Sequence, residues 1–351
     1  MNLRTPIAAA IAALSLAACT AGGPSPEPAS TSGSTNTPPS AALTAIPSSS
    51  PTGTQTIGLP NLTGRIAFGR ITGEGMYGEQ LMALFAMNAD GSDLVQLTDD
   101  NSYIPVWSLD GARLAFTLYE PEDGSAQVAT IAADGTDLTV LTSGPGIHAA
   151  GSWSPDGTWI AYEASDQTPG DTGFHTVLWR MDADGSNQTR LGSSDAFDYL
   201  PRISPDGASV LFQRYLDDGS ESLLLLDVAT GEERILTEHR AINADWAPDG
   251  LSIVAQTESS AGAHWGPVVR IAIDDPAESA WIELFPGGDE SGGFKPVHSP
   301  DGAKIAFGCV RPEVSRSEAI CVMNDDGTDV QTLVDDPTSD ENEVSWGRAP
   351  G

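Results

Sequence analysis

Lysine is almost missing from this 351-residue chain, in which only Lys295 and Lys304 occur. Arginine raises the number of basic residues to 16 against 49 acidic ones, so the formal net charge is -33 at pH 7. A surface this negative repels nucleic acid and anionic lipid, because it offers no basic patch to neutralise phosphates. We therefore predict no nucleic-acid partner. The carboxylates leave open binding of a cation or a basic partner, and they also favour solubility.

Patterns that carry catalysis or tight metal binding are also missing. The five histidines form no His-x-His or His-Glu-x-x-His pattern, and no Gly-x-Ser-x-Gly nucleophile elbow occurs. The segment 182–187 begins like a calcium loop, but it lacks the glutamate that an EF-hand has at position 12. We accordingly expect no catalytic residues, no metal and no cofactor, with calcium as the alternative.

The N-terminus has the pattern of an export signal. After Arg4, an apolar run of 12 residues covers 7–18, which is too short for a permanent membrane span. Its end, Leu16-Ala17-Ala18-Cys19, resembles a bacterial lipobox. We predict a lipoprotein signal peptide over 1–18 and lipidation of Cys19, with an ordinary signal peptide as the alternative. The protein would then be exported and lipid-anchored to the cell envelope, on its periplasmic or extracellular face, with the lipid as its sole membrane contact.

Residues 19–61 are rich in proline, serine and threonine and nearly free of charge. Such a segment buries too little apolar surface to offset its chain entropy. We interpret it as a disordered tether, kept extended by its prolines, that holds the folded part away from the membrane.

One short motif recurs along the remaining chain. Trp153-Ser154-Pro155-Asp156-Gly157 is followed by Ile160-Ala161-Tyr162, and related copies surround the aspartates at 110, 206, 249 and 301. The steps between these aspartates are 46, 50, 43 and 52 residues. Self-similarity at this period is typical of a stacked or radial array of repeats.

Each repeat predicts four strands. The Trp segment forms strand A, the Ile-Ala-Phe type forms strand B, and an Asp-Gly hairpin joins strands C and D. No helical periodicity of useful length interrupts them. The first unit, 64–98, lacks strand A, while the chain ends in a strand A at Val344-Ser345-Trp346-Gly347 with no B after it. Pairing of this C-terminal strand A with the N-terminal strands B–D would close the ring, which removes exposed edges. The sequence therefore predicts an all-β, six-bladed β-propeller of four-stranded antiparallel blades over 62–348.

These repeats, with Met-Asn-Ala-Asp-Gly-Ser and Leu-Thr at the C–D hairpin of the first unit, resemble the WD-like repeats of the TolB-like β-propellers. The resemblance covers about residues 62 to 348 and implies the propeller fold. It says little about function.

The repeated residues are interpreted as architecture. The tryptophans at 107, 153, 246 and 346 are expected to pack between blades, and the motif aspartates to stabilise the A–B turns. His298 stands at a Trp position and is expected to be a packed, hydrogen-bonded core group. Cys309 and Cys321 lie on adjacent strands and predict a disulfide in an oxidising compartment, with two free thiols as the alternative.

Variable residues are the candidates for function. In propellers, binding usually uses the end where the B–C and D–A connections lie, together with the channel mouth. We place the residue four before each Trp, and the next one, at this mouth. The resulting binding residues are Tyr103, Tyr199, Asn243, Phe294, Lys295, Asn342 and Glu343. Aromatic rings with a few polar groups suit a sugar or a peptide end, although they could also simply plug the channel.

The sequence thus predicts a monomeric, non-catalytic envelope lipoprotein that binds or scaffolds a protein or glycan. The alternatives are a cation-dependent propeller enzyme, of the polysaccharide lyase or lactonase type, and an extracytoplasmic sensor domain.

Overall fold

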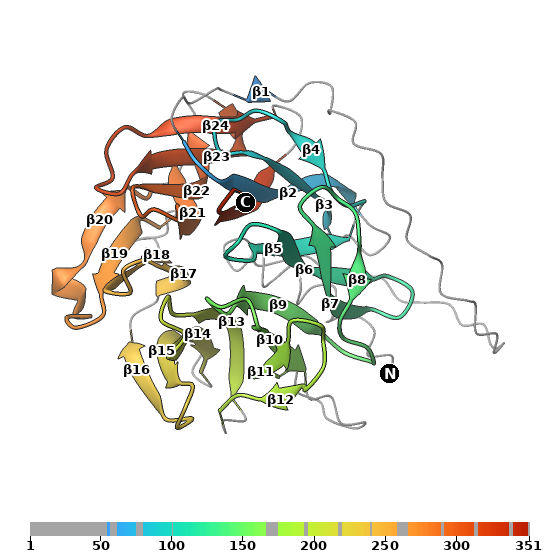
Figure 1. Ribbon diagram of the computed structural model, residues 1–351. Coiled ribbons are helices and arrows are strands. Elements are labelled where there is room, and N and C mark those ends of the chain that lie inside the picture. The colour runs from blue at the N-terminus through green and yellow to red at the C-terminus, as the bar shows by residue number, and fades with distance from the viewer. Residues whose placement is uncertain are drawn as a thin grey trace, which may run out of the picture.

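The computed structural model is a ring of six four-stranded antiparallel blades (Figure 1). The structure describes residues 55–56, 62–74, 80–99, 101–165, 175–192, 196–216, 220–238, 241–257, 266–288, 291–311, 315–336 and 340–349. The predicted signal peptide and Cys19 lie outside these residues. So do two of the five histidines, His239 and His264.

The first three blades follow the predicted order from the channel outward. Blade 1 consists of β25 (Glu341–Gly347), β2 (Arg65–Glu74), β3 (Gln80–Asn88) and β4 (Val95–Gln96). Blade 2 consists of β5 (Ser102–Trp107), β6 (Arg113–Glu120), β7 (Ser125–Ala132) and β8 (Thr139–Val140). Blade 3 consists of β9 (His148–Trp153), β10 (Trp159–Ser165), β11 (Thr176–Asp182) and β12 (Thr189–Arg190).

The last three blades repeat this order. Blade 4 consists of β13 (Phe197–Ile203), β14 (Ser209–Tyr215), β15 (Glu221–Asp227) and β16 (Glu233–Thr237). Blade 5 consists of β17 (Ala241–Trp246), β18 (Ser252–Thr257), β19 (Val268–Ala272) and β20 (Ile282–Phe285), with the 3-10 turn η2 (Glu278–Ala280) before β20. Blade 6 consists of β21 (Gly292–His298), β22 (Lys304–Arg311), β23 (Ser315–Asn324) and β24 (Gln331–Asp335).

The ring closes as the sequence predicts. The C-terminal strand β25 pairs antiparallel with β2, with Trp346 opposite Ile66, and so completes blade 1. The N-terminal side adds a second link, because β1 (Gln55–Thr56) pairs with β24 as a fifth strand of blade 6. The end of the predicted tether therefore belongs to a sheet. Chain segments from both ends thus join the first and last blades.

The apolar core is divided among the blade interfaces. Each of the six interfaces has its own cluster of buried side chains, such as Ile66, Phe68 and Trp346 with Leu333 of blade 6. The predicted Trp packing is found there: Trp153 Nε1 donates to the Val106 carbonyl of the preceding blade at 3.2 Å.

The repeated aspartates stabilise the A–B turns, which join the two innermost strands of each blade. Asp156 accepts hydrogen bonds from Ser154 Oγ at 2.6 Å and from the Thr158 N–H at 3.0 Å, and these bonds lower the pKa of Asp156 to about 2. Asp110, Asp206 and Asp301 make the same pair of contacts. The motif is therefore structural.

Among the described residues, no helix is both long and apolar enough to cross a membrane.

Candidate functional site

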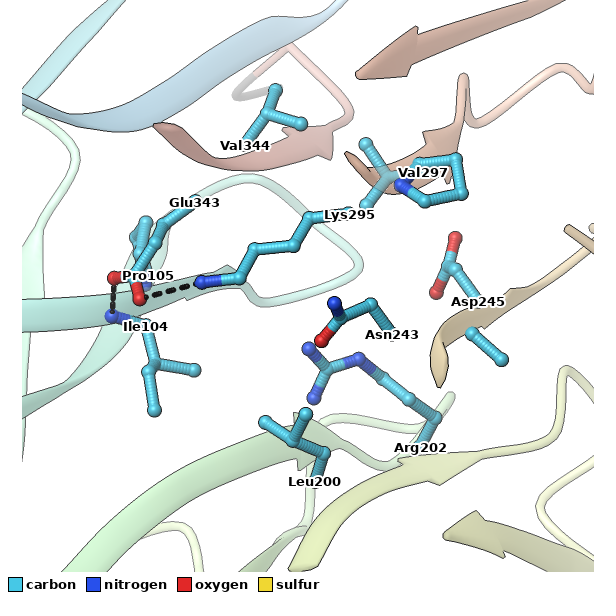
Figure 2. A pocket seen from close by; sticks show the side chains of 12 residues that line it. Ile104, Pro105, Leu200, Arg202, Asn243, Asp245, Lys295, Val297, Glu343 and Val344 are labelled. Atoms are coloured by element: carbon cyan, nitrogen blue, oxygen red, sulfur yellow. Dashed lines mark hydrogen bonds and ion pairs between the residues drawn. The ribbon is translucent and has the colours of Figure 1, made fainter. Parts of the chain in front are cut away.

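A pocket lies at the centre of the ring, where side chains from five of the six innermost strands meet (Figure 2). Its volume is about 480 Å³ with the open mouth included. The lining residues are Ile104, Pro105, Leu200, Arg202, Asn243, Ala244, Asp245, Lys295, Pro296, Val297, Glu343 and Val344. Most of them lie in the middle or the second half of their strands, so the pocket lies inside the channel, along the middle of the innermost strands.

β-Bulges in the five innermost strands that line the pocket shape it. Between Tyr103 and Val106, β5 has one residue more than its partner β6, and β13, β17, β21 and β25 show the same shift. The bulge residues have positive φ, near 50°: Ile104, Leu200, Asn243, Lys295 and Glu343. Few non-glycine residues adopt this left-handed conformation, which re-aims a side chain. Here it turns each side chain toward the channel.

The bulges correct part of the predicted site. The structure brings Asn243, Lys295 and Glu343 together in the pocket, but the other four predicted residues do not line it. Tyr103, Tyr199, Phe294 and Asn342 are 4 to 7% exposed. The residue before each bulge is buried in the blade, so the predicted aromatic rings do not line this pocket.

Contacts show where these four side chains go instead. Tyr199 donates its hydroxyl to Glu221 Oε1 at 2.7 Å, and Tyr103 donates to the Gln80 carbonyl at 2.6 Å. Phe294 lies so close to Gly308 that a Cβ there would be 2.1 Å from its ring. Asn342 Nδ2 reaches Glu318 Oε2 at 3.4 Å.

The sequence contained a signal for the bulge. Proline follows the bulge residue at positions 105, 201 and 296. Proline cannot donate to a sheet ladder, so inside an inner strand it indicates a bulge. Sequence reasoning also missed Arg202 and Asp245, which lie one position before the Trp site and face the same pocket.

Side chains from the preceding blade bind most of the bulge backbone. The N–H of Leu200 donates to Glu163 Oε2 at 2.9 Å, and the N–H of Asn243 donates to Gln213 Oε1 at 2.7 Å. The N–H of Ala150 likewise donates to Thr117 Oγ1 at 3.0 Å. These acceptors occupy equivalent positions on strand B.

Blade 1 has glycine at the equivalent position, Gly69, and uses a different acceptor. The N–H of Ile104 contacts the carboxylate of Glu343, which also accepts from Lys295 Nζ at 2.9 Å. Both oxygens of Glu343 are therefore engaged. This carboxylate of β25 therefore links β5 and β21 across the pocket.

Burial shifts the titration of the groups around the pocket. Desolvation raises the pKa of Glu163 to about 8. This effect outweighs the hydrogen bond from the Leu200 N–H and the charge of Arg202, both of which lower the pKa. Burial also raises the pKa of Asp245 and lowers that of Arg202. Asp245 accepts the His298 N–H at 3.1 Å.

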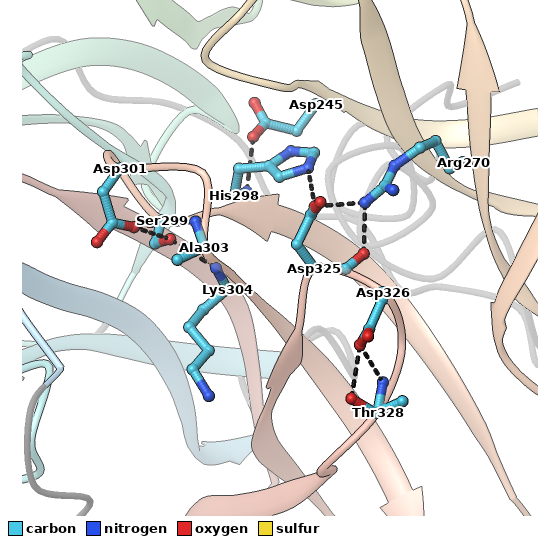
Figure 3. Close-up of polar contacts among 10 residues, drawn as sticks. All are labelled: Asp245, Arg270, His298, Ser299, Asp301, Ala303, Lys304, Asp325, Asp326 and Thr328. Atoms are coloured by element: carbon cyan, nitrogen blue, oxygen red, sulfur yellow. Dashed lines mark hydrogen bonds and ion pairs between the residues drawn. The ribbon is translucent and has the colours of Figure 1, made fainter.

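His298 is a buried core group at the Trp position of blade 6, as predicted (Figure 3). Its Nε2 lies 3.3 Å from Asp325 Oδ1, and burial lowers its pKa. Arg270 contacts both the carboxylate and the carbonyl of Asp325. This cluster joins blades 5 and 6 and lies outside the pocket lining.

The remaining sequence candidates have structural partners. Cys309 and Cys321 are joined by a disulfide across β22 and β23, with Cα atoms 5.8 Å apart. In the calcium-like loop, Asp182 accepts from Asn187 Nδ2 at 2.6 Å and Asp184 from Ser186 Oγ at 2.6 Å. Within the described part of the chain, no three His, Cys, Asp or Glu residues are grouped to hold a metal.

Comparison with known families gives a match over more than half of the chain. The model of the TolB beta propeller domain matches residues 80–274. An uncharacterised protein of Agrobacterium fabrum is 30% identical over 161 residues, which are 42% of this chain and 52% of that protein. A TolB homologue of Chlorobium luteolum is 30% identical over 158 residues, 43% of this chain and 33% of that protein. The chain thus spans about half or less of the length of these curated relatives.

Solved structures support the same fold. TolB from Acinetobacter baumannii superposes with a TM-score of 0.65 at 20% identity, over 81% of this chain and 66% of that one. A putative TolB from Agrobacterium tumefaciens gives 0.57 at 20% identity, over 81% and 98%.

Proposed function

We propose, given that this chain belongs to the TolB beta propeller domain family, that it is a non-catalytic binding or scaffolding propeller of the cell envelope. Its partner, a protein or a glycan, would bind over the channel end where the B–C and D–A connections lie. The protein would act as a monomer whose sole membrane contact is a lipid on Cys19.

One observation carries the binding role. The blades repeat their turns and interfaces, but the side chains that the bulges turn inward differ: Ile104, Leu200, Asn243, Lys295 and Glu343. A merely structural channel needs no such mixture of apolar, amide and charged groups, whereas a ligand site combines apolar walls with a few placed polar groups.

The contacts of the carboxylates support a non-catalytic role. Glu343 is engaged by Lys295 and the Ile104 N–H, and Asp245 accepts from the His298 backbone. These carboxylates stabilise the channel wall, and we assign them no part in acid–base chemistry. No cofactor is needed for this role.

Site-directed photocrosslinking tests the binding end. A benzophenone amino acid would replace Leu200, which lines the pocket, and in a matched control Leu251, which is 70% exposed in the turn between β17 and β18. Irradiation of intact cells of the source organism should give a discrete adduct from position 200 alone, identified by mass spectrometry after protease or glycosidase digestion. No adduct from position 200, or the same adducts from both positions, would contradict the proposal.

The disulfide supports the envelope location, because such bonds persist in oxidising compartments. Cell fractionation with Cys19→Ala tests the anchor. The wild type should partition with membranes and incorporate labelled fatty acid, while Cys19→Ala should do neither. Equal labelling of both proteins would refute lipidation of Cys19.

A further inference from the structure

Arg202 is a half-buried cation of the channel that has no carboxylate partner in direct contact within the part of the chain that the structure describes. Its Nη1 donates to the carbonyls of Gly151 at 2.7 Å and Pro201 at 3.3 Å. Among the described residues it forms no salt bridge, whereas Lys295 in the same pocket is paired with Glu343. A partly desolvated charge without a direct counter-charge attracts an anion, and the open side of the pocket lets one reach it.

The two carbonyls fix the orientation of the guanidinium. Because both accept from Nη1, the edge formed by Nε and Nη2 is left for a ligand. Figure 2 shows this side chain extending into the pocket beside Asn243. Two parallel N–H groups on one guanidinium edge match the two oxygens of a carboxylate.

The surrounding carboxylates do not contact the Nε–Nη2 edge of Arg202. Glu343 is engaged by Lys295 and the Ile104 N–H. Among the described residues no salt bridge joins Asp245 to Arg202, and Asp245 acts on Arg202 only through its charge at a distance. Glu163, whose pKa burial raises to about 8, is largely protonated at neutral pH. The positive charge of Arg202 is therefore not cancelled by a direct contact.

We propose that the channel pocket binds a carboxylate group of its ligand, held by two hydrogen bonds on the Nε–Nη2 edge of Arg202. The apolar walls formed by Ile104, Leu200 and Val344 take the hydrocarbon part next to that group. This inference rests on the proposed binding function and specifies the chemistry that the partner must present.

Fluorine NMR with a matched pair of small probes tests the proposal. 4-Fluorobenzoate carries a carboxylate, and 4-fluorobenzamide has the same shape without charge. The wild-type protein should bind the benzoate at least about tenfold more tightly than the amide, as expected for a charge-assisted pair. Arg202→Gln should abolish this preference, and Arg202→Lys should reduce it, because lysine keeps the charge but loses the two-pronged geometry.

Controls separate binding from folding. Arg113→Gln removes a guanidinium at the start of β6 in blade 2, outside the pocket lining, where it pairs with the exposed Asp137, and should leave the preference intact. Should Arg202→Gln fail to fold, the Nε–H resonance of Arg202 in the wild type gives the answer: it should shift on titration with benzoate and not with the amide. Equal binding of acid and amide, or a preference that survives Arg202→Gln, would overturn the proposal.

Two peptide probes identify the source of the carboxylate. N-acetyl-glycyl-leucine carries it at the chain end, and N-acetyl-aspartyl-leucinamide carries it on a side chain. Either one binding through Arg202 supports the proposal and shows which source is preferred. Failure of all the carboxylate probes while Leu200 still crosslinks to a partner would reject this inference and leave the binding function standing.

Discussion

Two adjacent residues on the innermost strand of blade 4 have different surroundings. Tyr199 is buried and bonds Glu221 through its hydroxyl, while Leu200, with φ at 52°, lines the channel. The left-handed residue breaks the alternation that a regular strand would impose, and its N–H then needs an acceptor. Glu163 provides that acceptor from inside the protein, where its Oε1 has no hydrogen-bond partner.

Replacing Glu163 with glutamine should stabilise the protein, and more so at high pH. The folded pKa of Glu163 is raised to about 8 from its usual value of 4.5. The folded state therefore holds a proton that the unfolded chain releases, so the stability is fully present below pH 4.5 and falls as the pH rises toward 8. Glutamine keeps the acceptor for Leu200 without the charge. We expect a gain of roughly 1–3 kcal/mol at pH 8 and little at pH 4.5.

Urea unfolding at both pH values measures this difference. Glu283→Gln, on the exposed part of β20, is the matched control and should change the free energy of unfolding equally little at either pH. A Glu163→Gln effect that does not depend on pH would contradict the assignment.

At the scale of the strand, the bulge is stable because a neighbouring blade holds it. Gln213 on β14 accepts the Asn243 N–H of β17 at 2.7 Å and donates to the Tyr199 hydroxyl at 3.2 Å. It is 3% exposed, so its loss would leave a buried donor unpaired. The pocket wall of one blade thus depends on a side chain of the blade before it.

Gln213→Leu should lower the free energy of unfolding by about 1–3 kcal/mol, because the Asn243 N–H loses its acceptor. Chemical denaturation measures the change, and amide hydrogen exchange at Asn243 should accelerate. Gln188→Leu, which alters an exposed glutamine that bonds the Gly185 carbonyl, should be close to neutral. Equal effects of the two substitutions would argue against the bridging role of Gln213.

At the scale of the whole molecule, the ring depends on contacts between the chain ends. β25 supplies the inner strand of blade 1, and Trp346 packs with Phe68 and with Leu333 of blade 6. Trp346 Nε1 also donates to the Thr63 carbonyl at 3.0 Å. Each blade buries apolar side chains against both of its neighbours, so opening one interface exposes apolar surface on two blades.

Trp346→Ala should therefore destabilise the entire propeller, by about 3–5 kcal/mol, as expected for truncation of a buried tryptophan. Calorimetry should show one cooperative transition at a lower Tm for the whole ring. Leu251→Ala, at an exposed turn, should leave the Tm nearly unchanged. Independent melting of blade 1, with the other blades unaffected, would refute closure as the source of cooperativity.

The sequence by itself determined the blade number, the strand order and the closure of the ring. These follow from local chemistry repeated at a fixed period: an Asp-Gly turn, a Trp that needs a partner blade, and a lone strand A near the C-terminal end of the sequence. It also determined which residues are architectural, since Asp156 and its counterparts recur in the same turn.

Only the tertiary structure decided which variable side chains share a site. Counting back four residues from each Trp position put Tyr103, Tyr199 and Phe294 at the mouth, but the bulge that follows each of them leaves them outside the pocket lining. The unpaired state of Arg202 is likewise invisible in the sequence, because it depends on the positions of carboxylates from other blades. A left-handed residue and a long-range charge balance are set by packing among distant segments, which a repeat pattern does not record.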